Sequence, residues 1–211
     1  MHYAIVYNVN KRKGEWAMVA SHKVQTKNKK SIKKKTAKIK VNVKGKPGKK
    51  TVWEILFAIG LIALPLITGV VSTFITGNAM MSFGKLNQPP LAPPAWLFPI
   101  AWTILYILMG VALLMIYRAE PKNKAEQKLQ IAEIIVFFVQ LVFNFMWTIL
   151  FFALEARLFA FCWLIVMWLM IFALICMCVK SHRKAAAWCL VPYIIWCTFA
   201  AYLNIMIVLL N

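Results

Sequence analysis

Amide and aromatic side chains recur at helical spacing within two long apolar segments of the sequence. In the earlier segment, Gln140, Asn144 and Trp147 follow one another at i, i+4 and i+7, which places them on one face of a helix. Phe151 follows one turn later. If the segment crosses a membrane, these amides must face protein or a wet cavity, because lipid offers them no hydrogen bond. Two interpretations remain open: a wall of a ligand pocket, or interhelical hydrogen bonds that only hold the helices together.

The last apolar segment carries a second stripe of the same kind. Its members share one helical face: Tyr193, Trp196, Ala200, Leu203 and Asn204. Pro192 loosens the backbone beneath them. Two aromatic rings, a gap at a small residue and an amide suit a flat, mostly apolar ligand better than an ion. Packing is the alternative, since tryptophan and tyrosine are common near membrane interfaces.

A third aromatic group follows a proline-rich loop. Prolines at 89, 90, 93 and 94 fix φ and remove backbone donors, so ordinary helix begins only after them. Trp96 and Trp102 stand on the helix that follows, with Tyr106 one turn beyond. We expect the loop at 77–94 to roof a pocket and this aromatic wall to line it.

The residue types that perform acid–base or metal chemistry are missing from the apolar segments. The chain has no Asp, and these segments hold no His and only Glu54 and Glu133, both near segment ends. We expect Glu133 to lie near a helix start, where it favours the helix dipole and the headgroups. The sequence also lacks Ser/His/Asp and CxxC patterns and any glycine-rich phosphate loop. We therefore expect no catalytic residue, no metal site and no cofactor, and ligand handling by shape, stacking and a few hydrogen bonds.

The elements that must position these side chains are helices. The chain of 211 residues is 62% hydrophobic, and five of its segments are long and apolar enough to span a bilayer. Lipid forbids unsatisfied backbone groups, so the predicted fold class is all-α, a five-transmembrane-helix bundle. The five cysteines all lie in these segments and are expected to be plain buried thiols. The predicted helices are about 53–76, 95–117, 131–152, 158–179 and 186–210.

The formal charge of +19 is concentrated in a tail at residues 1–50, which holds 16 of the 25 Lys and Arg residues. The tail has few large apolar residues, so we expect it to be disordered. Our preferred interpretation is a solvated tail that sets topology and touches anionic lipid. Contact with nucleic acid through lysine alone is disfavoured, because no aromatic residues are interleaved and no fold accompanies the charges. A dispensable leader, translated from an upstream start codon, is the remaining alternative. The membrane domain then comprises residues 51–211.

Positive charge in the loops predicts the orientation. If the tail is cytoplasmic, the short loops on that side carry seven Lys and Arg residues, whereas the opposite side carries only Lys85 and Arg157. We therefore expect an integral, multi-pass protein of a bacterial cell membrane, with its N-terminus in the cytoplasm and its C-terminus outside. The proline loop lies on the outer face in this topology.

Three separated blocks resemble one known family. In chain order they read PPAWLFPIAWTILYILMG from Pro93, QLVFNFMWTILFF from Gln140 and VPYIIWCTFAAYLN from Val191. They are similar to the tryptophan-rich sensory protein and translocator protein family (TspO/MBR, the peripheral-type benzodiazepine receptor family). The resemblance covers roughly residues 53–211 and leaves the tail unmatched.

The resemblance implies a five-helix bundle, commonly a homodimer, whose cavity binds porphyrins such as protoporphyrin IX and haem. Some members also bind sterols and synthetic ligands. The family's loop prolines, pocket aromatics, third-helix amide and fifth-helix small residue fall on positions of this chain that the spacing already places on inward faces. Spacing and resemblance together give these candidate ligand-binding residues: Pro93, Pro94, Trp96, Tyr106, Asn144, Trp147, Phe151, Tyr193, Trp196, Ala200 and Asn204.

Two departures from the family pattern bear on function. Many members carry a tryptophan two residues before the proline pair, where this chain has Leu91, and this weakens light-driven porphyrin breakdown as an activity. The C-terminal end, LNIMIVLLN, lacks the Tyr and Arg of the cholesterol-recognition pattern. We therefore expect a non-enzymatic membrane sensor or transporter of tetrapyrroles. A photo-oxidative porphyrin-degrading enzyme and a stress-regulatory protein acting through a partner are the alternatives.

Overall fold

The computed structural model describes residues 25, 26, 29, 49–83 and 85–211. The chain divides into two units, Met1–Trp53 and Glu54–Asn211, and the second carries the candidate site. The expectation of a disordered tail at residues 1–50 falls almost wholly outside the described residues.

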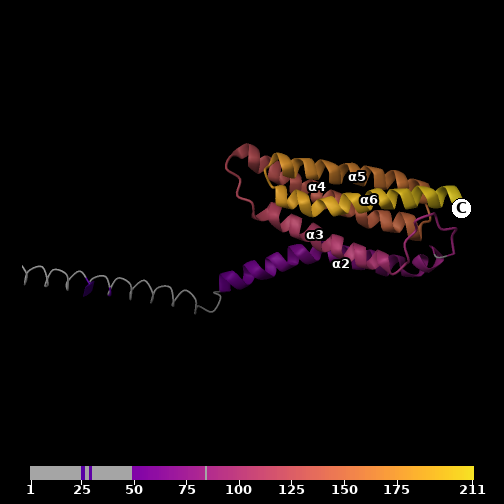
Figure 1. Ribbon diagram of the computed structural model, residues 1–211, viewed down its shortest axis with the longest axis horizontal. Coiled ribbons are helices and arrows are strands. Elements are labelled where there is room, and N and C mark those ends of the chain that lie inside the picture. Colours follow the sequence, from indigo (N-terminus) through magenta and orange to yellow (C-terminus); the bar gives the residue numbers. More distant parts are fainter. Residues whose placement is uncertain (1–24, 27–28, 30–48, 84) are drawn as a thin grey trace, which may run out of the picture. The chain divides into compact units, whose positions relative to one another are not determined.

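The described part of the chain contains five long helices, each apolar enough to span a membrane. This confirms the predicted all-α, five-span architecture, and the protein is a multi-pass integral membrane protein. A single π-helical turn, η1 (Ile149–Ala153), extends one of the helices. The helices, labelled in Figure 1, are α2 (Lys49–Phe83), α3 (Leu97–Arg118), α4 (Lys124–Thr148), α5 (Arg157–Lys180) and α6 (Lys184–Leu210).

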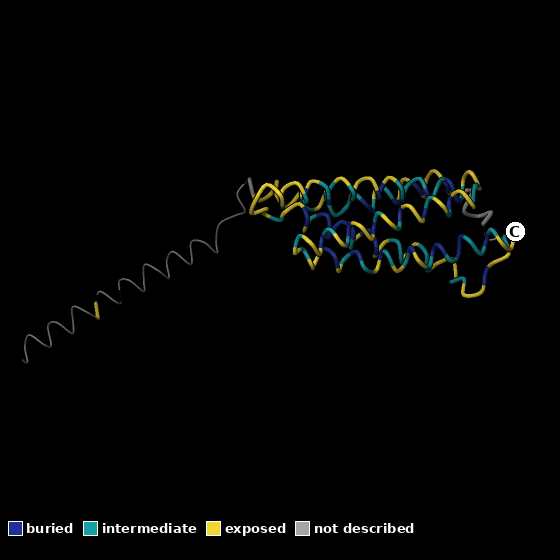
Figure 2. Tube along the Cα trace, turned by 90° about the horizontal axis from the view of Figure 1, so that it is seen from above, coloured by how far each residue is buried: buried dark blue, intermediate teal, exposed yellow. Residues whose placement is uncertain are grey.

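Four of the helices enclose the core. α3 contacts α4 and α6, and α5 contacts the same two helices, so the four form a closed bundle. Buried positions recur along the helices at helical spacing, with exposed positions between them (Figure 2). The exposed positions of the spans are largely apolar, as expected of helices that face lipid.

α2 packs on the outside of α3, and two glycines permit the close approach. A Cβ added at Gly110 would overlap the backbone of Ile62, and one added at Gly69 would overlap the ring of Tyr106. About two turns nearer the basic loops, the rings of Phe57 and Tyr117 lie 5.0 Å apart. Small residues bring membrane helices together in this way, because packing replaces the hydrophobic effect as the driving force.

The start of α4 differs from the prediction. The helix begins at Lys124 and not at 131, because a polar cap lies ahead of the apolar segment. The Asn123 side chain accepts a hydrogen bond from the Glu126 backbone N–H at 2.9 Å, and the Glu126 carboxylate accepts one from the Lys122 backbone N–H at 2.8 Å. These bonds satisfy donors that a helix start leaves free. The apolar pattern located the span and missed the polar turns that precede it.

Glu133 consequently lies nine residues after the start of α4, so the expectation that it lies near a helix start was wrong. Its side chain is fully buried, and it accepts hydrogen bonds from Arg183 and from the Ser181 hydroxyl, the latter at 2.7 Å. Both partners come from the α5–α6 loop. The buried ion pair therefore fastens that loop to α4.

Two further expectations need correction. α2 continues to Phe83, which shortens the loop expected at 77–94. The cysteines are all free, but Cys162 and Cys176 are exposed on lipid-facing surface and not buried. Apolar composition alone does not tell which face of a span points inward, and a thiol is tolerated on either side.

Candidate functional site

Trp102 lies at the centre of a cluster of aromatic rings contributed by three helices. Its ring stacks on Tyr106 with centroids 5.4 Å apart, and its centroid lies 6.4 Å from those of Trp147 and Tyr193. The ring of Trp196 meets it edge-on at 6.5 Å. These distances fall in the range in which aromatic pairs attract one another. α3, α4 and α6 thus converge on one half-buried indole.

A chain of hydrogen bonds runs beneath these rings. The Tyr106 hydroxyl donates to Asn144 Oδ1 at 2.8 Å, and Asn144 Nδ2 donates to the Tyr193 hydroxyl at 3.0 Å. That hydroxyl in turn donates to Gln140 Oε1 at 3.0 Å. All four side chains are buried, so each bond ties one helix to another in a medium that offers no competing water. The interhelical interpretation of the third-helix amides is therefore what these contacts show.

The end of α4 extends the cluster toward the proline loop. The indole of Trp147 stacks on Phe151 at 5.4 Å, and its Nε1 donates to Asn204 Oδ1 at 3.2 Å. Phe151 lies in the π-helical turn, in which the Leu154 N–H bonds five residues back to the Ile149 carbonyl. Such turns occur often at functional sites, because the extra residue re-aims the side chains around it.

The loop between α2 and α3 is fastened to the end of α6. The Tyr202 hydroxyl donates to the Pro90 carbonyl at 2.8 Å, and the side chain of Asn211 accepts from the Asn87 backbone N–H at 2.9 Å. Within the loop, Leu91 has φ 71, a left-handed conformation that favours glycine. The loop is therefore held over one end of the bundle by bonds to α6.

The structure brings together most of the predicted residues. Seven belong to one network of ring contacts and hydrogen bonds: Tyr106, Asn144, Trp147, Phe151, Tyr193, Trp196 and Asn204. Ala200 is buried on the same helix as three of these residues. The remaining three lie apart from the cluster: Pro93 and Pro94 belong to the loop, and Trp96, 63% exposed, precedes the first turn of α3.

Sequence reasoning left three participants out of the candidate set. Trp102 was placed in the aromatic wall without being recognised as its centre, and its i, i+4 spacing to Tyr106 was the available signal. Gln140 was noted on the shared face, and its role as acceptor from Tyr193 appears only in the structure. Tyr202 lies two residues after Ala200 and carried no signal, because its partner is 112 residues away.

The side chains of the cluster are aromatic rings and amides. Within the described residues, no group of three or more His, Cys, Asp and Glu side chains lies together. The cluster instead offers aromatic faces and amide groups.

Comparison with known proteins places these features in a family context. Residues 61–210 match the model of the TspO/MBR family. The chain is 34% identical to tryptophan-rich protein TspO of Chlorobaculum tepidum over 140 residues, which cover 66% of this chain and 85% of that protein. It is 33% identical to tryptophan-rich protein TspO of Archaeoglobus fulgidus over 75% of this chain and 99% of that protein. Similarity extends to the sheep (Ovis aries) translocator protein, at 30% identity over 70% of this chain and 85% of that protein.

Proposed function

The chain belongs to the TspO/MBR family, and on that premise we propose that it is a membrane sensor or transporter of tetrapyrroles. The ligand, a porphyrin or haem, binds in the aromatic cluster beneath the loop between α2 and α3. The observation that carries the proposal is the convergence of four rings from α3, α4 and α6 on Trp102. A planar macrocycle is the kind of ligand that several aromatic faces bind at once. Relatives of the chain are named as sensory or translocator proteins, which accords with binding that does not change the ligand chemically.

Binding in this cluster exchanges one set of ring contacts for another. The rings around Trp102 already lie 5.4 to 6.5 Å from it, so a macrocycle enters by displacing Trp102 and stacking on the rings that it leaves. Each aromatic pair contributes about 1 kcal/mol beyond the area that it buries. Several pairs, added to apolar burial, support a micromolar dissociation constant, which corresponds to about −8 kcal/mol.

The polar side chains give the ligand an orientation. Asn144 and Asn204 each take part in a hydrogen bond that joins α4 to α6, and both are buried. Polar edges of the macrocycle are expected to meet these amides, while Ala200 leaves room for its plane. The loop, fastened to α6 through Tyr202, acts as the lid that retains the ligand.

We further propose the cellular setting of the site. The segments 118–130 and 180–185, which lie at the end of the bundle opposite the loop, carry seven Lys and Arg residues, and this supports a cytoplasmic location for that end and an outer location for the loop and the C-terminus. We also propose that the chain lies in a bacterial cell membrane, with its basic tail against anionic lipid. By analogy with the family the protein functions as a homodimer.

A fluorescence titration tests the proposed function. Protoporphyrin IX added to the purified protein in detergent is expected to quench tryptophan emission with a micromolar midpoint. Trp196→Phe, which removes an indole in contact with Trp102, should weaken binding about threefold to tenfold. Trp188→Phe is the matched control, since Trp188 is on the same helix but is 71% exposed outside the cluster. Equal midpoints for the two variants, or no saturable quenching, would reject the proposal.

A further inference from the structure

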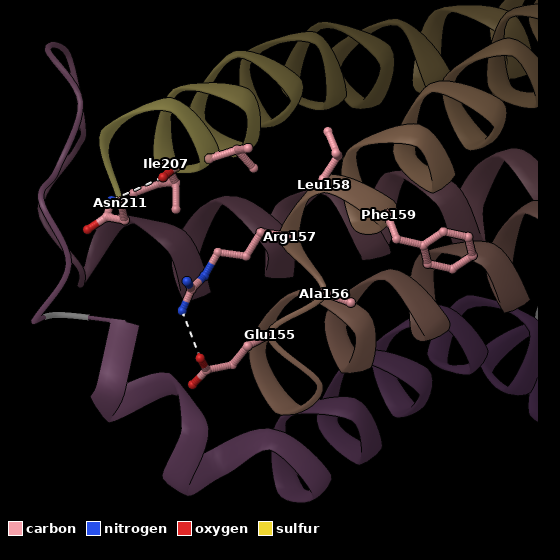
Figure 3. Close-up of a pocket in the computed structure, with 8 residues that line it drawn as sticks. Glu155, Ala156, Arg157, Leu158, Phe159, Ile207 and Asn211 are labelled. Atoms are coloured by element: carbon pink, nitrogen blue, oxygen red, sulfur yellow. Dashed lines mark hydrogen bonds and ion pairs between the residues drawn. The ribbon is translucent and has the colours of Figure 1, made fainter.

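A separate hollow of about 350 Å³ lies between the start of α5 and the end of α6, and no member of the aromatic cluster lines it. Its volume is at the lower end of the range for small-molecule sites, roughly 300–1,000 Å³, and it is open to the outside, so it does not suit a macrocycle. Figure 3 shows its lining, with Glu155 and Arg157 joined by an ion pair and with Leu158 and Phe159 further along α5. The residues are Glu155, Ala156, Arg157, Leu158, Phe159, Ile207, Val208 and Asn211.

The polar side of the hollow presents one charge of each sign. Arg157 Nη2 donates to a carboxylate oxygen of Glu155 at 3.2 Å, and this is the only side-chain hydrogen bond that its guanidinium makes to the described residues. A guanidinium has five N–H donors, so most of this group's capacity is open to a ligand. The Glu155 side chain is 57% exposed and retains its other oxygen. Both charges are therefore available, side by side, to a molecule in the hollow.

The position of the hollow along the bundle sets its surroundings. The membrane-spanning part of α5 begins at Arg157, and that of α6 ends at Leu210, so the hollow lies where the spans leave the hydrocarbon. Lipid headgroups occupy that level. Leu158 and Phe159 are both more than half exposed and continue the apolar lining onto the outer surface of the bundle. A ligand here meets charge at headgroup depth and apolar surface beside it.

We propose that this hollow binds a phospholipid with a zwitterionic, primary-amine headgroup, that is, a phosphoethanolamine lipid. Its phosphate binds the free N–H groups of Arg157, its ammonium group binds the Glu155 carboxylate, and its acyl region packs along Leu158 and Phe159. The paired charges decide the class, because an anionic headgroup without an amine would be repelled by Glu155. The apolar side chains favour a lipid over a soluble phosphate, because a soluble phosphate has no acyl chain to pack against them.

Native mass spectrometry tests the proposal by measuring how much lipid stays bound to the full chain. The chain is released from detergent in the presence of one defined lipid at a time. Dioleoyl phosphatidylethanolamine should bind with one tight site per chain, more tightly than the phosphatidylcholine, whose quaternary amine donates no hydrogen bond. Arg157→Gln should weaken that site about tenfold, the loss expected for charge-assisted hydrogen bonds. Val208→Phe, which fills the hollow without changing charge, should weaken it by a similar factor. Lys85→Gln, an exposed cation at the same end of the bundle, is the matched control and should change binding less than about twofold.

Glu155→Gln separates the zwitterionic from the anionic headgroup by the sign of its effect. It should weaken phosphatidylethanolamine binding and strengthen phosphatidylglycerol binding, because only the first ligand uses the carboxylate. Thermal unfolding and gel filtration of each variant show that the fold is retained, and Val208→Phe supplies an independent arm if Arg157→Gln unfolds. Tighter binding of phosphatidylglycerol than of phosphatidylethanolamine by the native chain would overturn the proposal. So would phosphatidylethanolamine binding that neither Arg157→Gln nor Val208→Phe alters, or displacement of the lipid by soluble phosphoethanolamine.

Discussion

Replacing Asn144 by leucine should loosen the bundle by an amount that its hydrogen bonds predict. The Asn144 side chain is buried and joins Tyr106 on α3 to Tyr193 on α6. Leucine has a similar volume and keeps the apolar contacts, so the change removes the hydrogen bonds with little change in packing. Of the two tyrosines, Tyr193 retains Gln140 as acceptor, whereas the Tyr106 hydroxyl is left without a partner among the described residues.

The expected cost follows from these contacts. Two interhelical hydrogen bonds in a membrane protein are worth about 0.6 kcal/mol each. The orphaned hydroxyl of Tyr106 adds at least about 1 kcal/mol. Asn144→Leu should therefore lower the free energy of unfolding by about 2 kcal/mol. Tyr106→Phe alone should cost about 1 kcal/mol. The double variant has no orphaned hydroxyl and should also cost only about 1 kcal/mol, which gives a coupling energy of about 2 kcal/mol.

Reversible unfolding in mixed detergent or bicelles measures these four free energies as a double-mutant cycle. A distant pair serves as the control, because sites without shared partners add within about 0.5 kcal/mol. Strictly additive effects of Asn144→Leu and Tyr106→Phe would refute the reasoning, since they would show that the hydroxyl does not depend on the amide.

The remaining predictions concern the α2 contact, the buried ion pair, the lid and the chemistry. Gly110→Ala should destabilise the protein by about 1–3 kcal/mol, because the added methyl group overpacks the contact with α2. Gly60→Ala, where no atom lies within 4 Å of the added Cβ, should be neutral or stabilising. Equal effects of the two changes in thermal unfolding would contradict the close approach of α2 and α3. Glu133→Gln should lower the free energy of unfolding by about 3 kcal/mol, because it leaves Arg183 without its counter-charge. Neutralising Glu133 and Arg183 together should recover much of that loss in the same unfolding assay. A double variant whose loss equals the sum of the two single losses would contradict the ion pair's contribution. Tyr202→Phe should speed porphyrin release about threefold in stopped-flow fluorescence, because one hydrogen bond that holds the loop, worth about 0.5–1.5 kcal/mol, is lost. An unchanged release rate would show that the loop does not retain the ligand. Illumination of the porphyrin complex should yield no new bilin-like product by absorbance and mass spectrometry; a product that accumulates with turnover would make the protein an enzyme.

The length and apolar character of the segments were sufficient to predict the five spans, and helical periodicity was sufficient to predict which side chains share a face. Asn144 and Trp147 on α4, and Tyr193 and Trp196 on α6, were grouped from their spacing, and the structure joins the two faces through hydrogen bonds and through Trp102. Such predictions succeed because a helix repeats every 3.6 residues whatever its neighbours are.

Contacts between distant segments were not predictable in the same way. Periodicity places Trp102 on a face but does not say which three helices meet there. Glu133 and Arg183 are 50 residues apart, and their pairing depends on how α4 packs against the α5–α6 loop. The start of α4 was missed for a different reason: the Asn123 to Glu126 cap was present in the sequence, but an apolar window does not weigh polar turns.

The most direct test of the proposed site is a two-dimensional ¹H–¹⁵N spectrum of the tryptophan indoles during protoporphyrin IX titration. We expect the indole signals of Trp102, Trp147 and Trp196 to shift together and to saturate with one midpoint, because the macrocycle's ring current acts on the rings that it contacts. The signals of Trp163 and Trp188, which lie outside the cluster, should stay in place. Saturable shifts at Trp163 or Trp188, with the three cluster indoles unmoved, would show that porphyrin binds outside the aromatic cluster.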